Sequence, residues 1–265
     1  MTETANKAMP KASRKEQDAG DELRVTAINS IAGADRTAWD ACANPNGLRL
    51  AADAPADDPL QEHVYNPFIS HDFFSALEES KSVGGRSGWL VQHLLVTDRN
   101  GTLQAAAPCY IKSHSRGEYV FDRGWAEAYE RAGGSYYPKL QVAVPFTPAT
   151  GRRLLVRPGP QAPALRQALT RGLLELCRHD DASGVHVTFA IEPEFRALGE
   201  FGFLQRNDQQ FHWQNADYGT FDDFLAALSS RKSKTLRRER QDALANGISV
   251  HWLACSDLTG AVWVS

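Results

Sequence analysis

The chain has 265 residues, 42% of them hydrophobic and 23% charged, with a formal net charge of −3. This composition is typical of a soluble globular protein, and the small net charge argues against a general electrostatic attraction to nucleic acid or anionic lipid. The length accommodates one large domain or two small ones. The cysteines at 42, 109, 177 and 255 form no C-x-x-C pair, which argues against a zinc ribbon or redox motif and suits a reducing compartment.

Residues 1–22 are polar and lack the apolar core of a secretory signal, so they are predicted to form a disordered tail. No run of about 18 apolar residues occurs in the sequence, as a membrane-spanning helix would require. Together these features predict a cytoplasmic protein.

The first part of the chain is predicted to place a strand before two helices. Residues 23–31 begin with the apolar and polar alternation of a strand. Asp35 is a suitable N-cap for a short helix through Cys42, and Ser70 is a suitable N-cap for a second helix. Between them, residues 43–66 are rich in Ala, Asp, Asn and Pro, which indicates a long loop.

A β-hairpin follows these helices. The apolar runs at 89–97 and 102–111 are predicted strands, and Asn100-Gly101 between them favours the positive φ of a tight turn. The next predicted elements are a helix over 125–131, strands over 140–144 and 153–156, a helix over 161–181 and a strand over 184–191. They are followed by a helix that begins at Pro193 and ends before Gly202, a strand over 210–213, helices beginning near Thr220 and Ser229, and a strand over 248–253.

Five segments of this sequence resemble a known family. They are NPFISHDF (66–73), EYVFD (118–122), YPKL (137–140), VPFTP (144–148) and the late helix with its closing Gly-Phe at 195–203. These segments are similar to those of the FemAB-like peptidoglycan biosynthesis proteins, which belong to the acyl-CoA N-acyltransferase (GNAT) superfamily.

The resemblance implies an α/β fold, with a GNAT-like mixed twisted sheet flanked by helices, as the first unit of a tandem pair. It implies a GNAT-like N-terminal domain over residues 23–215. Residues 216–265 would then be a basic helical linker and the start of an incomplete second GNAT-like domain, so a C-terminally truncated chain is expected.

Residues 105–157 combine apolar strands with a dense set of aromatic and ionisable side chains, the composition of a small-molecule site. N-acylation needs a proton acceptor and a donor to the oxyanion, and the catalytic candidates by residue type are Asp122, Tyr137 and Glu127. The substrate-binding candidates in this stretch are Trp125, Tyr129, Tyr137, Lys139, Thr147 and Arg152. The alternative interpretation is that the aromatic residues belong to the core and only their polar tips reach water.

The strongest charge feature is RKSKTLRRER at 231–240, where six basic residues and one acidic residue give +5. On a helix Arg231, Lys234 and Arg238 share a face, and with Arg237 they are candidates for binding a phosphate or carboxylate. The alternative is a solvated basic surface. The resemblance implies an anionic cell-wall precursor as acceptor, with an acyl carrier or aminoacyl-tRNA as donor.

GNAT proteins hold the CoA pyrophosphate on the backbone amides of a Gly-rich loop before a helix. The matching segment here, residues 156–161, has one glycine and two prolines, which lack amide hydrogens. Arg157 and Gly159 are therefore the candidates for binding acyl-CoA, and the prolines weaken the case for that cofactor.

The eight histidines include no i, i+4 pair, so no metal site is predicted. Two functions remain open at this point. One is an N-acyltransferase that moves an acyl or aminoacyl group to an amine of an anionic acceptor. The other is a non-catalytic binding module of the same shape, which recognises an anionic ligand or a partner protein.

Overall fold

The computed structural model describes residues 22–47, 65–209, 211–254 and 257–258. The predicted tail and most of the 43–66 loop lie outside these residues. The chain divides into two units, Met1–Arg206 and Asn207–Ser265. The predicted domain boundary at 215/216 stays a prediction.

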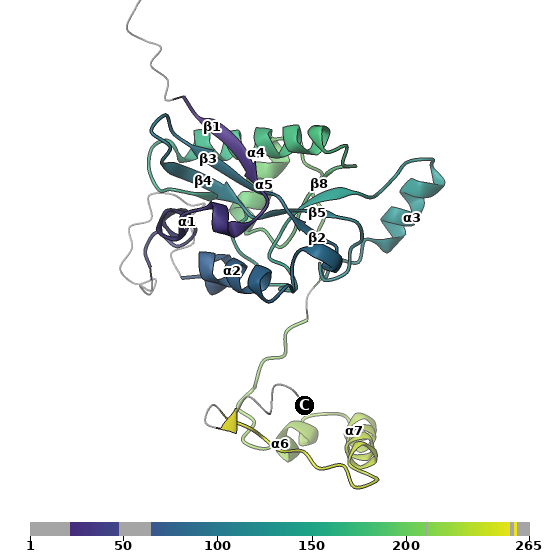
Figure 1. The fold of residues 1–265 in the computed structure, drawn as a ribbon. Helices are drawn as coiled ribbons and strands as arrows, with labels where there is room; N and C mark the ends of the chain where they lie inside the picture. The colour runs from purple at the N-terminus through teal and green to yellow at the C-terminus, as the bar shows by residue number, and fades with distance from the viewer. Residues whose placement is uncertain (1–21, 48–64, 210, 255–256, 259–265) are drawn as a thin grey trace, which may run out of the picture. The chain divides into compact units, whose positions relative to one another are not determined.

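The first unit contains β-strands and α-helices in a mixed order, which confirms the predicted α/β class (Figure 1). Its strands are β1 (Arg24–Ile28), β2 (Trp89–Val91), β3 (His93–Thr97), β4 (Leu103–Ala107), β5 (Cys109–Lys112), β6 (Lys139–Val142), β7 (Leu155–Val156) and β8 (Val185–Val187). Its α-helices are α1 (Arg36–Ala43), α2 (His71–Glu79), α3 (Arg123–Arg131), α4 (Ala162–His179) and α5 (Glu192–Glu200).

Sequence signals at the helix ends act as predicted. The Asp35 carboxylate accepts a hydrogen bond from the Ala38 amide at the start of α1, and the Ser70 hydroxyl accepts one from the Phe73 amide at the start of α2. Both side chains thereby satisfy amides that have no partner within the helix.

Each predicted strand of the long hairpin is divided in two, which corrects the continuous strands expected at 89–97 and 102–111. The division falls at Gln92 and at Pro108. Proline has no amide hydrogen and interrupts a ladder of hydrogen bonds. The result is two four-stranded sheets, with strand orders β1-β3-β4-β7 and β2-β5-β6-β8.

The first sheet is buried on both faces. Leu94 and Val96 of β3 pack in the cluster that contains the apolar side of α4, while Leu95 between them packs in the cluster of Trp39 and Phe74 from α1 and α2. Successive strand residues point to opposite faces, so one strand contributes to both layers. Figure 1 shows α4 on one side of the sheets and α1 and α2 on the other.

The second sheet has two unlike faces. Leu140 and Val142 of β6 belong to the apolar cluster that packs on α4. Lys139 and Gln141 alternate with them and are also buried, so the opposite face of the same strand is polar. This polar face carries the candidate site.

The second unit contains α6 (Phe221–Ala226) and α7 (Ser230–Ala243). Thr220 and Asp223 form a capping box at the start of α6, as acidic residues in a first turn suggest. The strands predicted at 210–213 and 248–253 are wrong for residues 211–213 and 248–253, which have no regular structure. A strand requires a hydrogen-bonded neighbour, and no ladder in the described chain includes either segment; Gln210 itself lies outside the described residues.

Three further observations complete the fold. Cys42, Cys109 and Cys177 are free thiols, and Cys255 lies outside the described residues. In the described part of the chain, no helix has the length and apolar character needed to cross a bilayer. Within the same residues, no three potential metal ligands come together as a group.

Candidate functional site

The site begins with the pairing of two short strands. Lys112 of β5 and Lys139 of β6 are opposite each other in the antiparallel ladder, and Gln141 of β6 is opposite His186 of the parallel strand β8. Because side chains alternate along a strand, Lys139 and Gln141 project from one face. Two buried lysines side by side require nearby negative charge or a shift in pKa.

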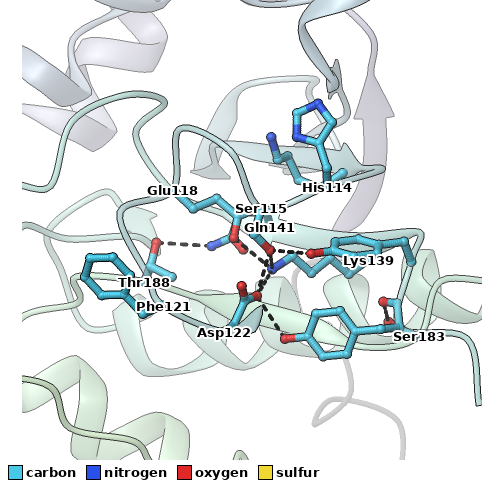
Figure 2. A network of polar contacts seen from close by, with 12 residues as sticks. His114, Ser115, Glu118, Phe121, Asp122, Lys139, Gln141, Ser183 and Thr188 are labelled. Atoms are coloured by element: carbon cyan, nitrogen blue, oxygen red, sulfur yellow. Dashed lines mark hydrogen bonds and ion pairs between the residues drawn. The ribbon is translucent and has the colours of Figure 1, made fainter. Parts of the chain in front are cut away.

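Lys139 is the centre of a buried hydrogen-bond network, drawn in Figure 2. Its ammonium lies 2.8 Å from Glu118 Oε2, 2.7 Å from Asp122 Oδ2 and 2.9 Å from Ser115 Oγ. The Lys139 side chain is 1% exposed. An ammonium has three donors, and all three are used here, so the Lys139 charge is neutralised within the protein.

Asp122 accepts hydrogen bonds from several directions. Besides Lys139, the Ser115 hydroxyl donates to its Oδ2 at 2.7 Å and the Tyr136 hydroxyl donates at 3.0 Å. Burial raises the pKa of Asp122, but hydrogen bonds from Lys139 and Ser115 outweigh burial and hold that pKa below its usual value. Asp122 is the N-cap residue of α3 yet makes no side-chain cap, because its carboxylate is turned toward Lys139.

Glu118 is the second carboxylate of the network. It is 3% exposed, and its Oε1 has no hydrogen-bond partner. Burial raises the pKa of Glu118 above its usual value, although the Lys139 charge opposes this. The two carboxylates therefore differ: Asp122 is held ionised, while Glu118 binds a proton more readily.

Lys112 extends the network toward β2. Its ammonium lies 3.6 Å from the centre of the Trp89 ring and donates to the Arg116 carbonyl oxygen at 3.2 Å. Burial lowers the pKa of Lys112 to about 8; Glu118 opposes the change and Lys139 adds to it. This lysine is therefore partly neutral near physiological pH.

The loop over the network depends on a glycine. Gly117 has φ of +81°, and a Cβ at this position would lie 2.5 Å from the Phe146 ring. Only glycine combines that backbone conformation with such close approach. The loop thereby brings Ser115 and Glu118 over the polar face of β6.

The outer rim of the network consists of half-buried residues: His114, Ser115, Tyr136, Tyr137 and His186. The His186 ring packs edge-on against Tyr136, with 5.6 Å between ring centres. Burial lowers the pKa of His186 to about 4, so this ring is neutral at physiological pH. The network thus extends from the buried face of β6 to the half-buried rim.

The structure brings two of the three catalytic candidates together. The Tyr137 hydroxyl lies 2.8 Å from Ser115 Oγ, which in turn bonds Asp122. The third candidate, Glu127, is exposed on α3 and pairs with Arg123 at 2.9 Å.

The substrate-binding candidates of the 105–157 stretch are dispersed. Lys139 lies in the network, whereas Trp125 and Tyr129 are exposed on α3. The Thr147 hydroxyl donates to the Pro145 carbonyl oxygen. Arg152 is buried at the end of α1, where it donates to the backbone carbonyl oxygens of residues 42 and 43.

The basic candidates form an exposed surface of α7 in the second unit. Arg237 pairs with Asp222 at 3.0 Å and Arg238 lies 3.6 Å from Asp242. Arg231 and Lys234 are exposed on the same helix. Ion pairs of this kind contribute little to stability.

The cofactor candidates lie between β7 and α4. The Arg157 amide bonds the Gln104 carbonyl and its side chain bonds the Leu103 carbonyl, while the Ala162 amide bonds the Gly159 carbonyl. Pro158 and Pro160 have no amide hydrogen, and the amides of residues 157 and 162 are already bonded. Four of the six positions from 157 to 162 therefore present no amide to a phosphate. The segment therefore does not fit a pyrophosphate cradle.

Sequence reasoning missed Ser115, Glu118 and Gln141 of the network, and His186 at its rim. The pattern that could have found Gln141 is the alternation Lys-Leu-Gln-Val at 139–142, which places two polar residues on one face of a strand. Ser115 and Glu118 lie in an irregular loop, and their positions depend on the fold.

A family model described as FemAB-like, peptidoglycan biosynthesis/recognition, matches residues 30–265. The chain belongs to this family. The match covers most of the chain and confirms the resemblance predicted from the sequence. No curated protein sequence matches the chain.

Among solved structures, the chain is similar to an acetyltransferase of Trypanosoma brucei, with 12% identity over 73% of this chain and 100% of the other at a TM-score of 0.38. It is also similar to the aminoglycoside 6'-N-acetyltransferase AAC(6')-Ih of Acinetobacter baumannii, with 13% identity over 73% of this chain and 99% of the other at a TM-score of 0.38. A third similar structure is the aminoglycoside N-acetyltransferase AAC(6')-Iy in complex with CoA, with 11% identity over 75% of this chain and 99% of the other at a TM-score of 0.40. Likeness at this level carries no inference about function.

Proposed function

We propose that this FemAB-like chain is an N-acyltransferase that uses the Lys139 network to receive the acceptor amine. The observation that carries the proposal is Glu118, a buried carboxylate with one oxygen fixed by Lys139 and the other without a partner. Its raised pKa suits a residue that must take up a proton. Family membership supports a role in peptidoglycan biosynthesis or recognition in general terms.

In the proposed reaction the acceptor nitrogen forms a bond to the acyl carbon, and the bond from that carbon to the donor's leaving atom breaks. Glu118 takes the proton that the nitrogen loses, and this proton then passes to the leaving group or to water. Lys139 has no donor left for substrate, so its role is to hold both carboxylates in place. Tyr137 donates its single hydroxyl hydrogen to Ser115, whose own hydrogen goes to Asp122, so the proposed role of Tyr137 is to hold Ser115 in place.

The acceptor is proposed to be anionic, as in a cell-wall precursor. The exposed rings of Trp125 and Tyr129 in the first unit would contact its apolar parts. Arg231, Lys234, Arg237 and Arg238 of α7 are proposed separately as an anion-binding surface of the second unit. Thr147 and Arg152 remain proposed contributors on sequence grounds. None of these residues is needed for the proton transfer itself.

The acyl donor is left open between acyl-CoA and aminoacyl-tRNA. Because the 157–162 segment offers few amides to a pyrophosphate, no step is assigned to CoA. Arg157 and Gly159 stay the sequence candidates for acyl-CoA, but the segment that contains them does not fit its pyrophosphate.

The test is an acyl-transfer assay with purified chain, a muropeptide precursor that carries a free amine, and either labelled acetyl-CoA or aminoacyl-tRNA. Glu118→Gln is expected to lower kcat by about 100-fold or more, the usual contribution of general-base catalysis. Glu175→Gln, an exposed glutamate on α4, is the matched control and is expected to act as wild type. Equal rates for the two variants would reject the proposal.

The second candidate function is a non-catalytic binding module, and the observation that favours it is the same amide-poor segment before α4. The two functions differ in their binding of donors. Isothermal titration calorimetry with acetyl-CoA and with aminoacyl-tRNA separates them: saturable heat with either donor favours the enzyme. Binding of the muropeptide precursor without binding of either donor favours the module.

A further inference from the structure

Two buried oxygen atoms of the site have no hydrogen-bond partner: Glu118 Oε1 and Gln141 Oε1. Glu118 is 3% exposed and Gln141 is 0% exposed. The other polar atom of each group is occupied, since Glu118 Oε2 accepts from Lys139 and Gln141 Nε2 donates to Thr188 Oγ1 at 3.1 Å. Buried polar atoms in proteins are nearly always paired, so these two oxygens indicate a missing donor.

Both oxygens belong to the same polar face. Gln141 follows Lys139 by two residues on β6 and therefore projects from the same side of the sheet. The Lys139 ammonium in turn holds the Glu118 carboxylate at 2.8 Å. Figure 2 shows the Glu118 and Gln141 side chains on the side of β6 where the Lys139 ammonium lies.

The charges facing this position nearly cancel. Glu118 and Asp122 contribute two negative charges when ionised, Lys139 contributes one positive charge, and Lys112, with its pKa lowered to about 8, contributes part of a second. His186, opposite Gln141, is neutral because burial lowers its pKa to about 4. The position therefore selects hydrogen-bond donors rather than net charge. A hydroxyl has one such donor, and a primary amine has two or, when protonated, three.

We propose that Gln141, together with Glu118, determines specificity for a primary amine, which donates one N–H to Glu118 Oε1 and another to Gln141 Oε1. This inference rests on the proposed function, because it specifies the acceptor group that the enzyme would acylate. It assigns Gln141 a role that none of the sequence patterns predicted. Glu118 would then both bind the nitrogen and take up its proton.

The experiment measures binding of three small probes by NMR of ¹⁵N-labelled full chain. The probes are n-propylamine, propan-1-ol, which has the same skeleton with one donor, and tetramethylammonium, which has charge without N–H. Wild type is expected to bind n-propylamine at least tenfold more tightly than either other probe, as charge-assisted hydrogen bonds permit. Saturable shifts are expected at the Gln141 side-chain amide.

Two variants and one control complete the test. Gln141→Leu is expected to reduce the preference for n-propylamine over propan-1-ol to less than threefold, and Gln141→Glu is expected to retain or increase it. The control Gln104→Leu makes the same chemical change at a glutamine that bonds Asp98 in the β3–β4 turn, and it is expected to bind as wild type.

Three outcomes would overturn the inference. Equal binding of n-propylamine and tetramethylammonium would show that charge alone is recognised. An unchanged preference in Gln141→Leu would show that the carboxamide is turned the other way and bonds within the protein. Absence of saturable amine binding would indicate that a water molecule fills the position. If Gln141→Leu transfers acyl groups with unchanged selectivity for the amine, only this inference is rejected. If the wild-type protein binds the amine selectively but transfers no acyl group, only the proposed function is rejected.

Discussion

The molecule places its charges in two contrasting ways. Around Lys139, one ammonium and two carboxylates are almost fully buried and fixed by hydrogen bonds between 2.7 and 2.9 Å. Along α7, six basic side chains at 231–240 lie on the surface and two of them pair with nearby aspartates. The buried group has a defined geometry and altered pKa values, which chemistry requires. The exposed group has charge that solvent and salt screen.

The comparison shows why a run of charge in a sequence is a weak indicator of a reactive site. The density of charge makes α7 the strongest charge feature of the sequence. The side chains of a solvated helix, however, are not held at fixed positions relative to a reacting atom. The Lys139 network draws single residues from separate segments, and only the fold brings them together. We expect the two regions to respond to mutation in opposite ways.

The largest effect is expected from Lys139→Met. This change leaves Glu118 and Asp122 buried without their shared cation, which should lower the free energy of unfolding by about 3–5 kcal/mol. Urea denaturation followed by circular dichroism measures it. Arg196→Met, which removes an exposed partner of Glu192, should cost less than about 1 kcal/mol. A similar small cost for Lys139→Met would contradict the account of the network.

The next effect concerns pH. The pKa of Lys112 is about 8 in the folded protein and about 10.4 in an unfolded chain. A lowered pKa means that the unfolded state binds the proton more tightly, so the free energy of unfolding should rise as pH increases from about 8 to 10.4. The gain is on the order of 3 kcal/mol.

Lys112→Met isolates this contribution from other groups that titrate in the same range. Urea denaturation at several pH values between 7.5 and 10.5 should show a wild type that gains stability relative to Lys112→Met across that range. A constant difference between the two proteins would mean that Lys112 has an ordinary pKa.

Part of this architecture follows from local sequence signals. Asp35 and Ser70 cap their helices, and Leu165, Leu169 and Leu173 form the buried stripe of α4, as their spacing predicts. These features depend on neighbours along the chain. The break at Pro108 also had a local cause, the missing amide, but the alternation of apolar residues on either side concealed it.

The site could be predicted only in part. Asp122, Tyr137 and Lys139 were indicated by residue type, and the structure joins all three through Ser115. Glu127 has the same residue type but lies on the exposed face of α3. The pKa of a side chain depends on its burial and on the charged or hydrogen-bonding groups beside it. Both are properties of the tertiary structure and cannot be read from the residue type alone.

A smaller effect is expected from Gly117→Ala in the loop over the network. The added Cβ meets the Phe146 ring at 2.5 Å on a backbone of positive φ, and a cost of about 2 kcal/mol is expected from strain and clash together. Gly101→Ala has a similar φ of +78° with no atom within 4 Å, so it reports strain alone, about 1 kcal/mol. Equal costs in thermal denaturation would show that the Phe146 contact is not tight.

The smallest effect on stability is expected from the double variant Lys234→Ala/Arg238→Ala on α7. Both side chains are exposed, and Arg238 contributes only a long ion pair with Asp242. The free energy of unfolding should change by less than about 0.5 kcal/mol. A loss above 1 kcal/mol in urea denaturation would mean that α7 is held by these charges.

The most direct test of the central claim is the ratio of kcat for Glu118→Gln to kcat for Lys234→Ala/Arg238→Ala in the same acyl-transfer assay. We predict that the buried variant loses about 100-fold or more in kcat, while the surface variant keeps the wild-type kcat. A Glu118→Gln protein that folds and turns over at the wild-type rate would contradict the assignment of the Lys139 network as the reacting site.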